Sequence, residues 1–207
     1  GDAYYSTLVD GLENGLGLPP AEFVYANDEA GTWSTYNFGG SDYSTVEDLD
    51  VSGDDVPFSE ASRVTLDGSA SNEYDVNLRA DVSDEAVNQG DVLLGVAYLR
   101  APEGSADLQY YARYAGEFSN EVDSGASPTL SGEWRRFYFP IEYGADAAAG
   151  DWWTEMWLAY GEQTIDVGGL ALLDFGTNAD VGQLPSGPAG QTYGPYYQQL
   201  VDDVTGR

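Results

Sequence analysis

The chain is built from short segments in which apolar and polar residues alternate, separated by clusters of Gly, Pro, Asp, Asn and Ser. Alternation with a period of two is typical of strands that bury one face, and breaks of this composition form turns. Ten such segments predict an all-β fold, an antiparallel β-sandwich of the jelly-roll type. The predicted strands are Glu22–Tyr25, Trp33–Phe38, Val46–Val51, Ser62–Leu66, Tyr74–Ala80, Val92–Arg100, Leu108–Tyr114, Trp134–Ile141, Trp152–Tyr160 and Gln163–Leu173.

Three of these strands carry apolar residues on one side and polar or aromatic residues on the other. The apolar sets include Tyr74, Val76, Leu78 and Ala80 in one strand, and Met156, Leu158 and Tyr160 in another. The opposite sets are Asn77 and Arg79, then Gln109, Tyr111 and Arg113, then Trp153, Glu155 and Trp157. Because successive side chains of a strand point to opposite faces, the opposite sets are expected to lie outside the core.

Two further strands have distinctive patterns. Val92–Arg100 is apolar on both faces, which predicts a central strand. Gln163–Leu173 is interrupted by Gly168 and Gly169, which predict a bulge or a tight bend.

Residues 1–177 are expected to form the sandwich, and residues 178–207 a linker with a short C-terminal helix. The stretch Asn178–Pro195 contains three Pro and four Gly, which is the composition of a linker. Tyr196–Val204 has the apolar spacing of a helix, and Ser83–Asn88 is a second candidate for one helical turn.

The residue types that the chain lacks exclude several classes of function. His and Cys are absent, which excludes a His general base, His-ligated zinc, disulfides and thiol catalysis. The formal net charge is −29, from 36 acidic and 7 basic residues. Such a charge repels phosphate groups, so we expect neither nucleic acid nor an anionic membrane as a partner. No apolar run is long enough to span a membrane.

All seven basic residues are Arg, and 22 Asp and 14 Glu are spread along the chain. This composition resembles that of proteins from halophilic archaea with molar internal salt, in which an acidic surface stays hydrated and its self-repulsion is screened. An ordinary acidic secreted protein is the alternative. In both cases we expect most carboxylates to keep the protein hydrated and soluble and not to belong to a binding or catalytic site.

Three segments, in this order, carry a family resemblance: Gly90–Leu94, Gly132–Pro140 and Leu158–Leu170. They resemble the galactose-binding-like jelly rolls of the family 4 and family 9 carbohydrate-binding modules, especially those that precede family 10 glycoside hydrolase domains. The likeness covers about Val56 to Gly176. It implies a monomeric, extracellular or cell-surface module without catalytic activity, which tethers an appended polysaccharide-degrading enzyme to β-glucan or xylan.

Sugar recognition needs flat aromatic faces for the apolar side of a pyranose ring and planar polar groups for its hydroxyls. The resemblance implies that the three two-faced strands are neighbours, so that their polar sets line one groove. The expected carbohydrate-binding residues are Asn77, Arg79, Gln109, Tyr111, Arg113, Glu155 and Trp157. The structural alternatives are pairing of the arginines with nearby acids and packing of Trp157 in the core. Trp134 is expected to be structural.

The resemblance also implies a structural Ca²⁺ between the N-terminal segment and the last strand. Glu13 and Asp174 are the implied ligands, since Ca²⁺ prefers oxygen donors. The stretch Leu8–Gly15 is similar to the opening of the family, but Leu12 stands where Phe is usual.

Two other functions stay open at this point. A glycosidase needs two carboxyl groups across a cleft, and Glu133 and Glu155 are the pair to check, although no surrounding motif selects them. A structural or adhesive sandwich that binds no sugar is the main alternative to a binding module.

Overall fold

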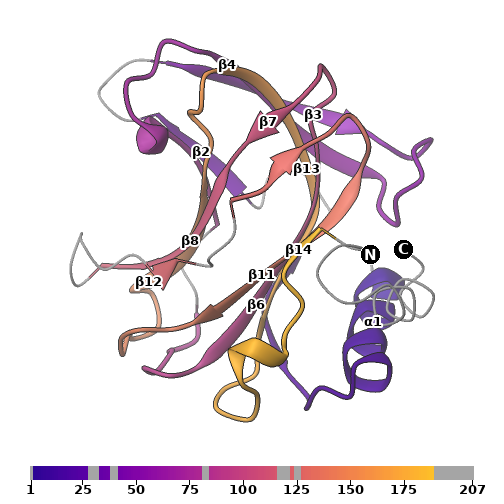
Figure 1. The fold of residues 1–207 in the computed structure, drawn as a ribbon, viewed down its shortest axis with the longest axis vertical. Coiled ribbons are helices and arrows are strands. Elements are labelled where there is room, and N and C mark those ends of the chain that lie inside the picture. The colour runs from indigo at the N-terminus through magenta and orange to yellow at the C-terminus, as the bar shows by residue number, and fades with distance from the viewer. Residues whose placement is uncertain are drawn as a thin grey trace.

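The computed structural model describes residues 2–27, 33–37, 42–80, 84–115, 122–123 and 127–188. Within these ranges the protein consists of antiparallel strands in two facing sheets, with one N-terminal helix, α1 (Asp2–Asp10), against the outside of the larger sheet (Figure 1). This arrangement confirms the predicted all-β sandwich.

The larger sheet has seven strands. Six of them follow one another in the order β14 (Gly187–Pro188), β11 (Arg135–Glu142), β6 (Val92–Arg100), β13 (Glu162–Asp174), β4 (Glu60–Asp67) and β3 (Ser44–Asp50). The seventh strand, β1 (Glu22–Asn27), pairs with the C-terminal half of β13, while β4 pairs with its N-terminal half. The doubly apolar strand β6 lies between β11 and β13, which confirms that it is central.

The smaller sheet has five strands in the order β2 (Trp33–Asn37), β5 (Val76–Ala80), β12 (Trp152–Trp157), β8 (Gln109–Tyr114) and β9 (Val122–Asp123). A separate ribbon joins β7 (Ala106–Asp107) to β10 (Thr129–Leu130). Each of the ten predicted strands corresponds to a strand of the structure, whereas the two-residue strands β7, β9, β10 and β14 were not predicted.

The main core lies between the two sheets and includes most of the two predicted apolar sets, although Tyr74 and Tyr160 of these sets are exposed. Val76, Leu78 and Ala80 of β5 and Met156 of β12 are buried there, together with Phe137, Phe139 and Ile141 of β11. Gly95 leaves room for the Tyr110 ring, because a Cβ at this position would stand 2.5 Å from the Tyr110 hydroxyl. Tyr110 in turn stacks on Phe139 at 4.3 Å between ring centroids.

A second core lies on the opposite face of the seven-stranded sheet, where α1 covers it. Tyr4, Tyr5, Leu8 and Leu12 face the sheet and recur at helical spacing, which is why this segment is a helix. A π-helical turn, Gly11–Gly15, continues α1. This helix was not predicted, because Leu8–Gly15 was interpreted only through its similarity to the opening of the family.

The predicted bulge in β13 is confirmed, and it explains how α1 is attached. The register with β6 shifts between Gly168 and Ala171. A Cβ on Gly168 would stand 2.5 Å from the Phe58 ring, and Gly169 has a φ of +58°. The widened backbone presents two carbonyls to the helix: the hydroxyl of Tyr4 donates to Gly169 O at 3.2 Å, and that of Tyr5 donates to Leu170 O at 3.0 Å.

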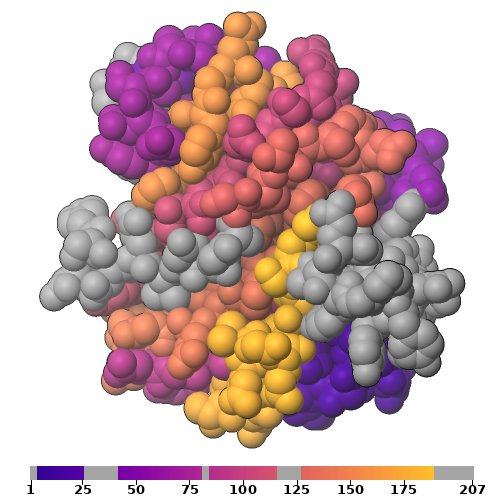
Figure 2. Space-filling view, viewed as in Figure 1, coloured from indigo at the N-terminus to yellow at the C-terminus, as the bar shows by residue number. Residues whose placement is uncertain are grey.

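The described chain continues on the sandwich beyond the boundary predicted near Thr177. A 3-10 turn, Val181–Gln183, is followed by β14, which pairs with β11. Ala179 and Leu184 are buried in the second core beside residues of α1. Figure 2 shows this yellow segment on the surface next to the indigo N-terminal segment. The sandwich therefore extends to at least Pro188, so the predicted boundary was placed too early.

The two helix predictions had different outcomes. Of Ser83–Asn88, residues 84–88 contain bends and a β-bridge between Val87 and Ala147, so the predicted turn of helix was wrong. Tyr196–Val204 lies outside the described residues and stays a prediction.

Candidate functional site

The outer face of the five-stranded sheet collects the predicted polar and aromatic residues. Its strands β5, β12 and β8 are neighbours, as expected. In the register, Glu155 lies between Arg79 and Tyr111, and Trp157 lies between Asn77 and Gln109. Trp153 is opposite Arg113. We call this set the polar–aromatic face; it comprises Asn77, Arg79, Gln109, Tyr111, Arg113, Trp153, Glu155 and Trp157.

The carboxylate of Glu155 is the centre of this face. Its Oε1 accepts hydrogen bonds from Arg113 Nη1 at 2.7 Å and from Trp157 Nε1 at 2.9 Å. Its Oε2 accepts one from Trp153 Nε1 at 3.1 Å. Glu155 is only 3% exposed, so three donors surround a carboxylate that has almost no contact with water.

The aromatic part of the face is centred on Trp157. Tyr111 lies against the indole, with 4.2 Å between ring centroids and 46° between ring planes. On the other side Tyr74 meets the same indole edge-on, at 5.5 Å and 68°. Trp157 and Tyr111 are half-buried and Tyr74 is exposed, so three rings from three elements remain accessible next to one another.

The two arginines of the face are held by its other residues. The Arg79 guanidinium carbon lies 3.8 Å from the centroid of the Trp153 ring, which is a close cation–π contact. Arg113 pairs with Glu155 and lies 5.9 Å from the Trp157 ring centroid. Both arginines are half-buried and held by these contacts, while part of each side chain still reaches the surface.

Two of the predicted binding residues, Asn77 and Gln109, are buried beneath the surface of this face. Asn77 is 1% exposed; its Nδ2 donates to Tyr74 O at 3.4 Å, and its Oδ1 has no hydrogen-bond partner among the described residues. Gln109 is buried and accepts a hydrogen bond from the hydroxyl of Ser127. These two amides therefore support the face from below, while Arg79, Tyr111, Arg113 and Trp157 form its surface.

Two residues of this region were not among the predicted site residues. Trp153 follows the same alternation as Glu155 and Trp157, so the pattern itself contained it. Tyr74 was assigned to the core face, which was wrong, because β5 begins only at Val76 and Tyr74 lies in a 3-10 turn, Glu73–Asp75. Asn72 and Asp75 form the capping box of that turn, and this pair is the sequence signal that could have placed Tyr74 outside the strand.

The seven-stranded sheet carries a contrasting cluster of Arg and Trp. Asp166, which is fully buried, accepts two hydrogen bonds from Arg63 and one from Arg100. Arg100 also lies 4.5 Å from the centroid of the Trp134 ring, whose Nε1 donates to Asp54 at 2.8 Å. Phe58 packs edge-on against Trp134. Arg63 and Arg100 are therefore paired with acids in this cluster. Among the expected binding residues, Arg113 also pairs with an acid, Glu155. Trp134 is structural, as expected.

The two carboxylates considered for catalysis belong to different sheets. Glu155 lies in β12 with its oxygens occupied by three donors. Glu133 is exposed just before β11 of the other sheet. The structure thus does not present them as a pair across a cleft.

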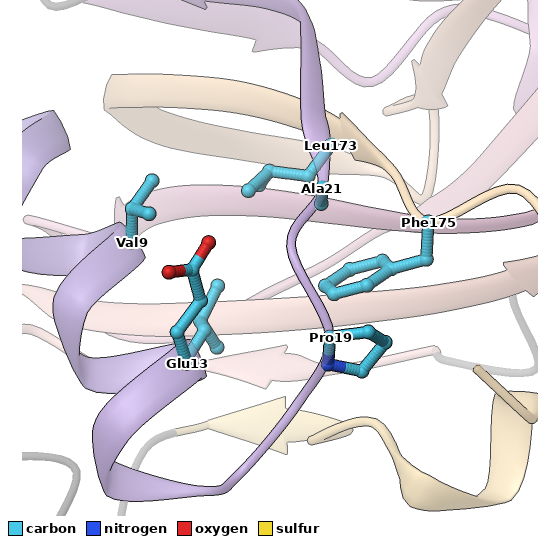
Figure 3. A pocket seen from close by; sticks show the side chains of 7 residues that line it. Val9, Glu13, Pro19, Ala21, Leu173 and Phe175 are labelled. Atoms are coloured by element: carbon cyan, nitrogen blue, oxygen red, sulfur yellow. The ribbon is translucent and has the colours of Figure 1, made fainter. Parts of the chain in front are cut away.

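The two implied calcium ligands, Glu13 and Asp174, do not both line the pocket beside α1. Glu13 lines a shallow pocket between α1 and the sheet, and its neighbours there include Leu173 and Phe175 (Figure 3). Asp174 lies between those two residues in sequence but is not among the residues that line this pocket. In the described part of the protein no three His, Cys, Asp or Glu side chains are grouped to hold a metal ion. Calcium binding stays a prediction.

Burial and neighbouring groups change the pKa of the Asp174 carboxyl. Partial burial raises the pKa of its carboxyl, a hydrogen bond from Gly176 N–H lowers it, and the charges of Asp91 and Glu22 raise it further. A carboxyl whose pKa is raised in the folded protein is protonated more readily there than in the unfolded chain. The folded state therefore loses stability as the pH rises through the titration range of Asp174.

Replacing Asp174 with Asn is expected to stabilise the protein at neutral pH by about 0.5–1 kcal/mol, the range for a partly exposed charge. Asn keeps an oxygen that can accept the Gly176 N–H but carries no charge to be repelled by Asp91 and Glu22. Denaturant unfolding at pH 7 and at acidic pH measures the effect, which should shrink as Asp174 becomes protonated. A loss of stability at pH 7 would contradict this account and would fit a role for Asp174 as a cation ligand.

No known protein family and no curated protein matches the sequence. Solved structures do match the fold. The second N-terminal cellulose-binding domain of Cellulomonas fimi β-1,4-glucanase C is 16% identical with a TM-score of 0.54; the match covers 79% of this chain and 99% of that domain. The CBM22-1 xylan-binding domain of Paenibacillus barcinonensis Xyn10C is 11% identical with a TM-score of 0.53, covering 77% and 97%.

A third match is a two-module structure. The CBM22-1–GH10 modules of a Clostridium thermocellum endo-1,4-β-D-xylanase, solved with xylohexaose, are 10% identical to this chain with a TM-score of 0.53. The match covers 74% of this chain and 29% of that one. At such identities the likeness concerns the fold alone, and it confirms the predicted jelly-roll sandwich. In the described part of the chain, no helix has the length and hydrophobicity needed to cross a bilayer.

Proposed function

We propose that the chain is a non-catalytic carbohydrate-binding module that attaches a polysaccharide-degrading enzyme to β-glucan or xylan outside the cell or at its surface. The observation that carries this proposal is the polar–aromatic face, on which three accessible rings and two ordered guanidinium groups lie together. Rings bind the apolar side of a pyranose, and guanidinium groups bind its hydroxyls. Similar folds that bind xylan and cellulose support the proposal.

The angles between the rings favour a particular form of polysaccharide. Tyr111 and Tyr74 are tilted by 46° and 68° from the plane of Trp157. Rings at such angles cannot lie flat on one planar surface, so they do not suit the face of crystalline cellulose. They suit a single, soluble glycan chain whose sugar rings change orientation along its length.

The module acts by proximity in this proposal. An enzyme joined to it stays near its polymer, and a second binding event then becomes intramolecular at a high effective concentration. The module contributes no acid or base to hydrolysis in this proposal, because Glu155 is enclosed by donors and Glu133 lies just before β11 of the other sheet.

Affinity electrophoresis in gels with and without soluble xylan or β-glucan tests the proposal, alongside a pull-down on crystalline cellulose, all in molar KCl. We expect retardation by at least one soluble polymer and little retention on crystalline cellulose. If no polymer retards the chain, the structural or adhesive sandwich becomes the better assignment. Release of reducing sugar from any of the polymers would instead indicate an enzyme.

A further inference from the structure

Glu155 differs from the other residues of the polar–aromatic face, because its charged group hardly reaches the surface. Trp157, Tyr111 and Arg79 are half-buried, whereas Glu155 is 3% exposed. Both of its oxygens are engaged by the side chains around it. A residue that binds a sugar hydroxyl directly needs an accessible oxygen, which this arrangement does not offer.

The hydrogen bonds of Glu155 link it to the two tryptophans of its own strand. Trp153 and Trp157 are two residues before and two residues after Glu155, so all three side chains lie on the same face of β12. The carboxylate accepts the indole N–H of each, at 3.1 Å and 2.9 Å. Each bond fixes the rotation of one indole, because the N–H lies in the plane of the ring.

We propose that Glu155 is a positioning residue, which holds the Trp157 ring in the orientation that receives the glycan and the Trp153 ring against Arg79, and does not itself contact the sugar. This inference rests on the proposed function. It replaces the expectation that Glu155 binds a hydroxyl directly.

The surrounding charges make this role possible. A buried carboxylate is tolerated only when it is paired and hydrogen-bonded, and Arg113 supplies the pairing charge at 2.7 Å. Hydrogen bonds to an ionised acceptor are stronger than those between neutral groups, so the indoles are held more firmly than by an amide. Arg79 covers the Trp153 ring and restrains it from a second side.

The benefit for binding is preorganisation. Side chains that are ordered before the ligand arrives lose less conformational entropy when it binds. Without Glu155 the two indoles would have to be ordered by the glycan itself, and the measured affinity would fall although no direct contact had been removed.

Nitrogen-15 NMR of the full chain tests the proposal through the indole N–H signals, which are observed without any glycan. The chain contains five Trp, and Trp153→Phe and Trp157→Phe identify the two relevant signals. The test variants are Glu155→Ala, which removes the acceptor, and Glu155→Gln, which keeps an acceptor oxygen but not the charge. Glu162→Gln is the control, since Glu162 is an exposed carboxylate in the other sheet.

In Glu155→Ala we expect both indole signals to shift and to exchange faster with solvent, and the affinity for the polymer that binds the unmodified chain to fall about tenfold. Glu155→Gln should give intermediate values for all three quantities, and Glu162→Gln should match the unmodified chain. If Glu155→Ala unfolds, the indole signals and affinity of Glu155→Gln are compared with those of Glu162→Gln to test the proposal.

Two results would overturn the proposal. One is that both indole signals stay unchanged in the Glu155 variants. The other is that the indole signals shift while the affinity does not fall, so that the orientation of the rings does not matter for binding. A fall in affinity with unchanged indole signals is a form of the first result and would make Glu155 a direct ligand. A chain that binds no polymer at all would refute the proposed function, and the indole signals would still decide whether Glu155 holds the rings.

Discussion

Trp157→Ala is expected to weaken glycan binding by about 30-fold, equivalent to about 2 kcal/mol for the loss of a central aromatic contact. Trp157 is the ring that both Tyr111 and Tyr74 contact, so its removal leaves those two rings without a common partner. It also removes one of the donors to Glu155. Isothermal titration calorimetry with a soluble xylan or β-glucan oligosaccharide measures the change.

Phe23→Ala is the matched control for this prediction. Phe23 is 37% exposed and lies in β1 of the other sheet, so its removal deletes an accessible ring away from the polar–aromatic face. Its affinity should equal that of the unmodified chain. Equal losses of affinity in the two variants would show that binding does not depend on the polar–aromatic face. Unchanged affinity in Trp157→Ala would show that Trp157 is not part of the binding site.

Thermal stability should rise strongly with salt, by about 10 °C in the unfolding midpoint between dilute buffer and molar KCl. At a formal net charge of −29 the folded chain repels itself. The screening length falls from about 30 Å at 10 mM salt to about 3 Å at 1 M, which removes most of that repulsion. Calorimetry or circular dichroism over a KCl series measures the midpoint.

Sorbitol at matched osmolality separates screening from general stabilisation by cosolutes. We expect a clearly smaller rise with sorbitol than with KCl. A midpoint that is unchanged or lower in KCl would contradict the electrostatic argument, and with it the resemblance of this composition to that of halophilic proteins, which otherwise stays a prediction.

Strand positions and faces could be predicted from the sequence because they depend on local alternation. Asn77 and Arg79, for example, lie opposite the buried Val76 and Leu78, as the pattern required. The short strands could not be predicted, since two residues contain no periodicity. Residues 178–188 were misassigned because Pro and Gly are frequent in linkers, yet Leu184 is buried in the second core and β14 pairs with β11.

The members of the candidate site could be predicted better than their roles. Parity placed Glu155 and Trp157 on one face, but it does not reveal that the carboxylate points at the two indoles next to it. That depends on side-chain torsions and on Arg113 from another strand. The position of Tyr74 was predicted wrongly because it lies in one turn of 3-10 helix, where the alternation of a strand does not apply.

The contacts that form the polar–aromatic face have a consequence for the ionic environment in which it can work. Its arginines are already engaged within the protein, Arg113 by Glu155 and Arg79 by the Trp153 ring. A neutral pyranose carries no charge, so there is little electrostatic attraction between sugar and protein for dissolved ions to screen. Molar salt would therefore raise the stability of the fold and leave the affinity for an uncharged polysaccharide unchanged.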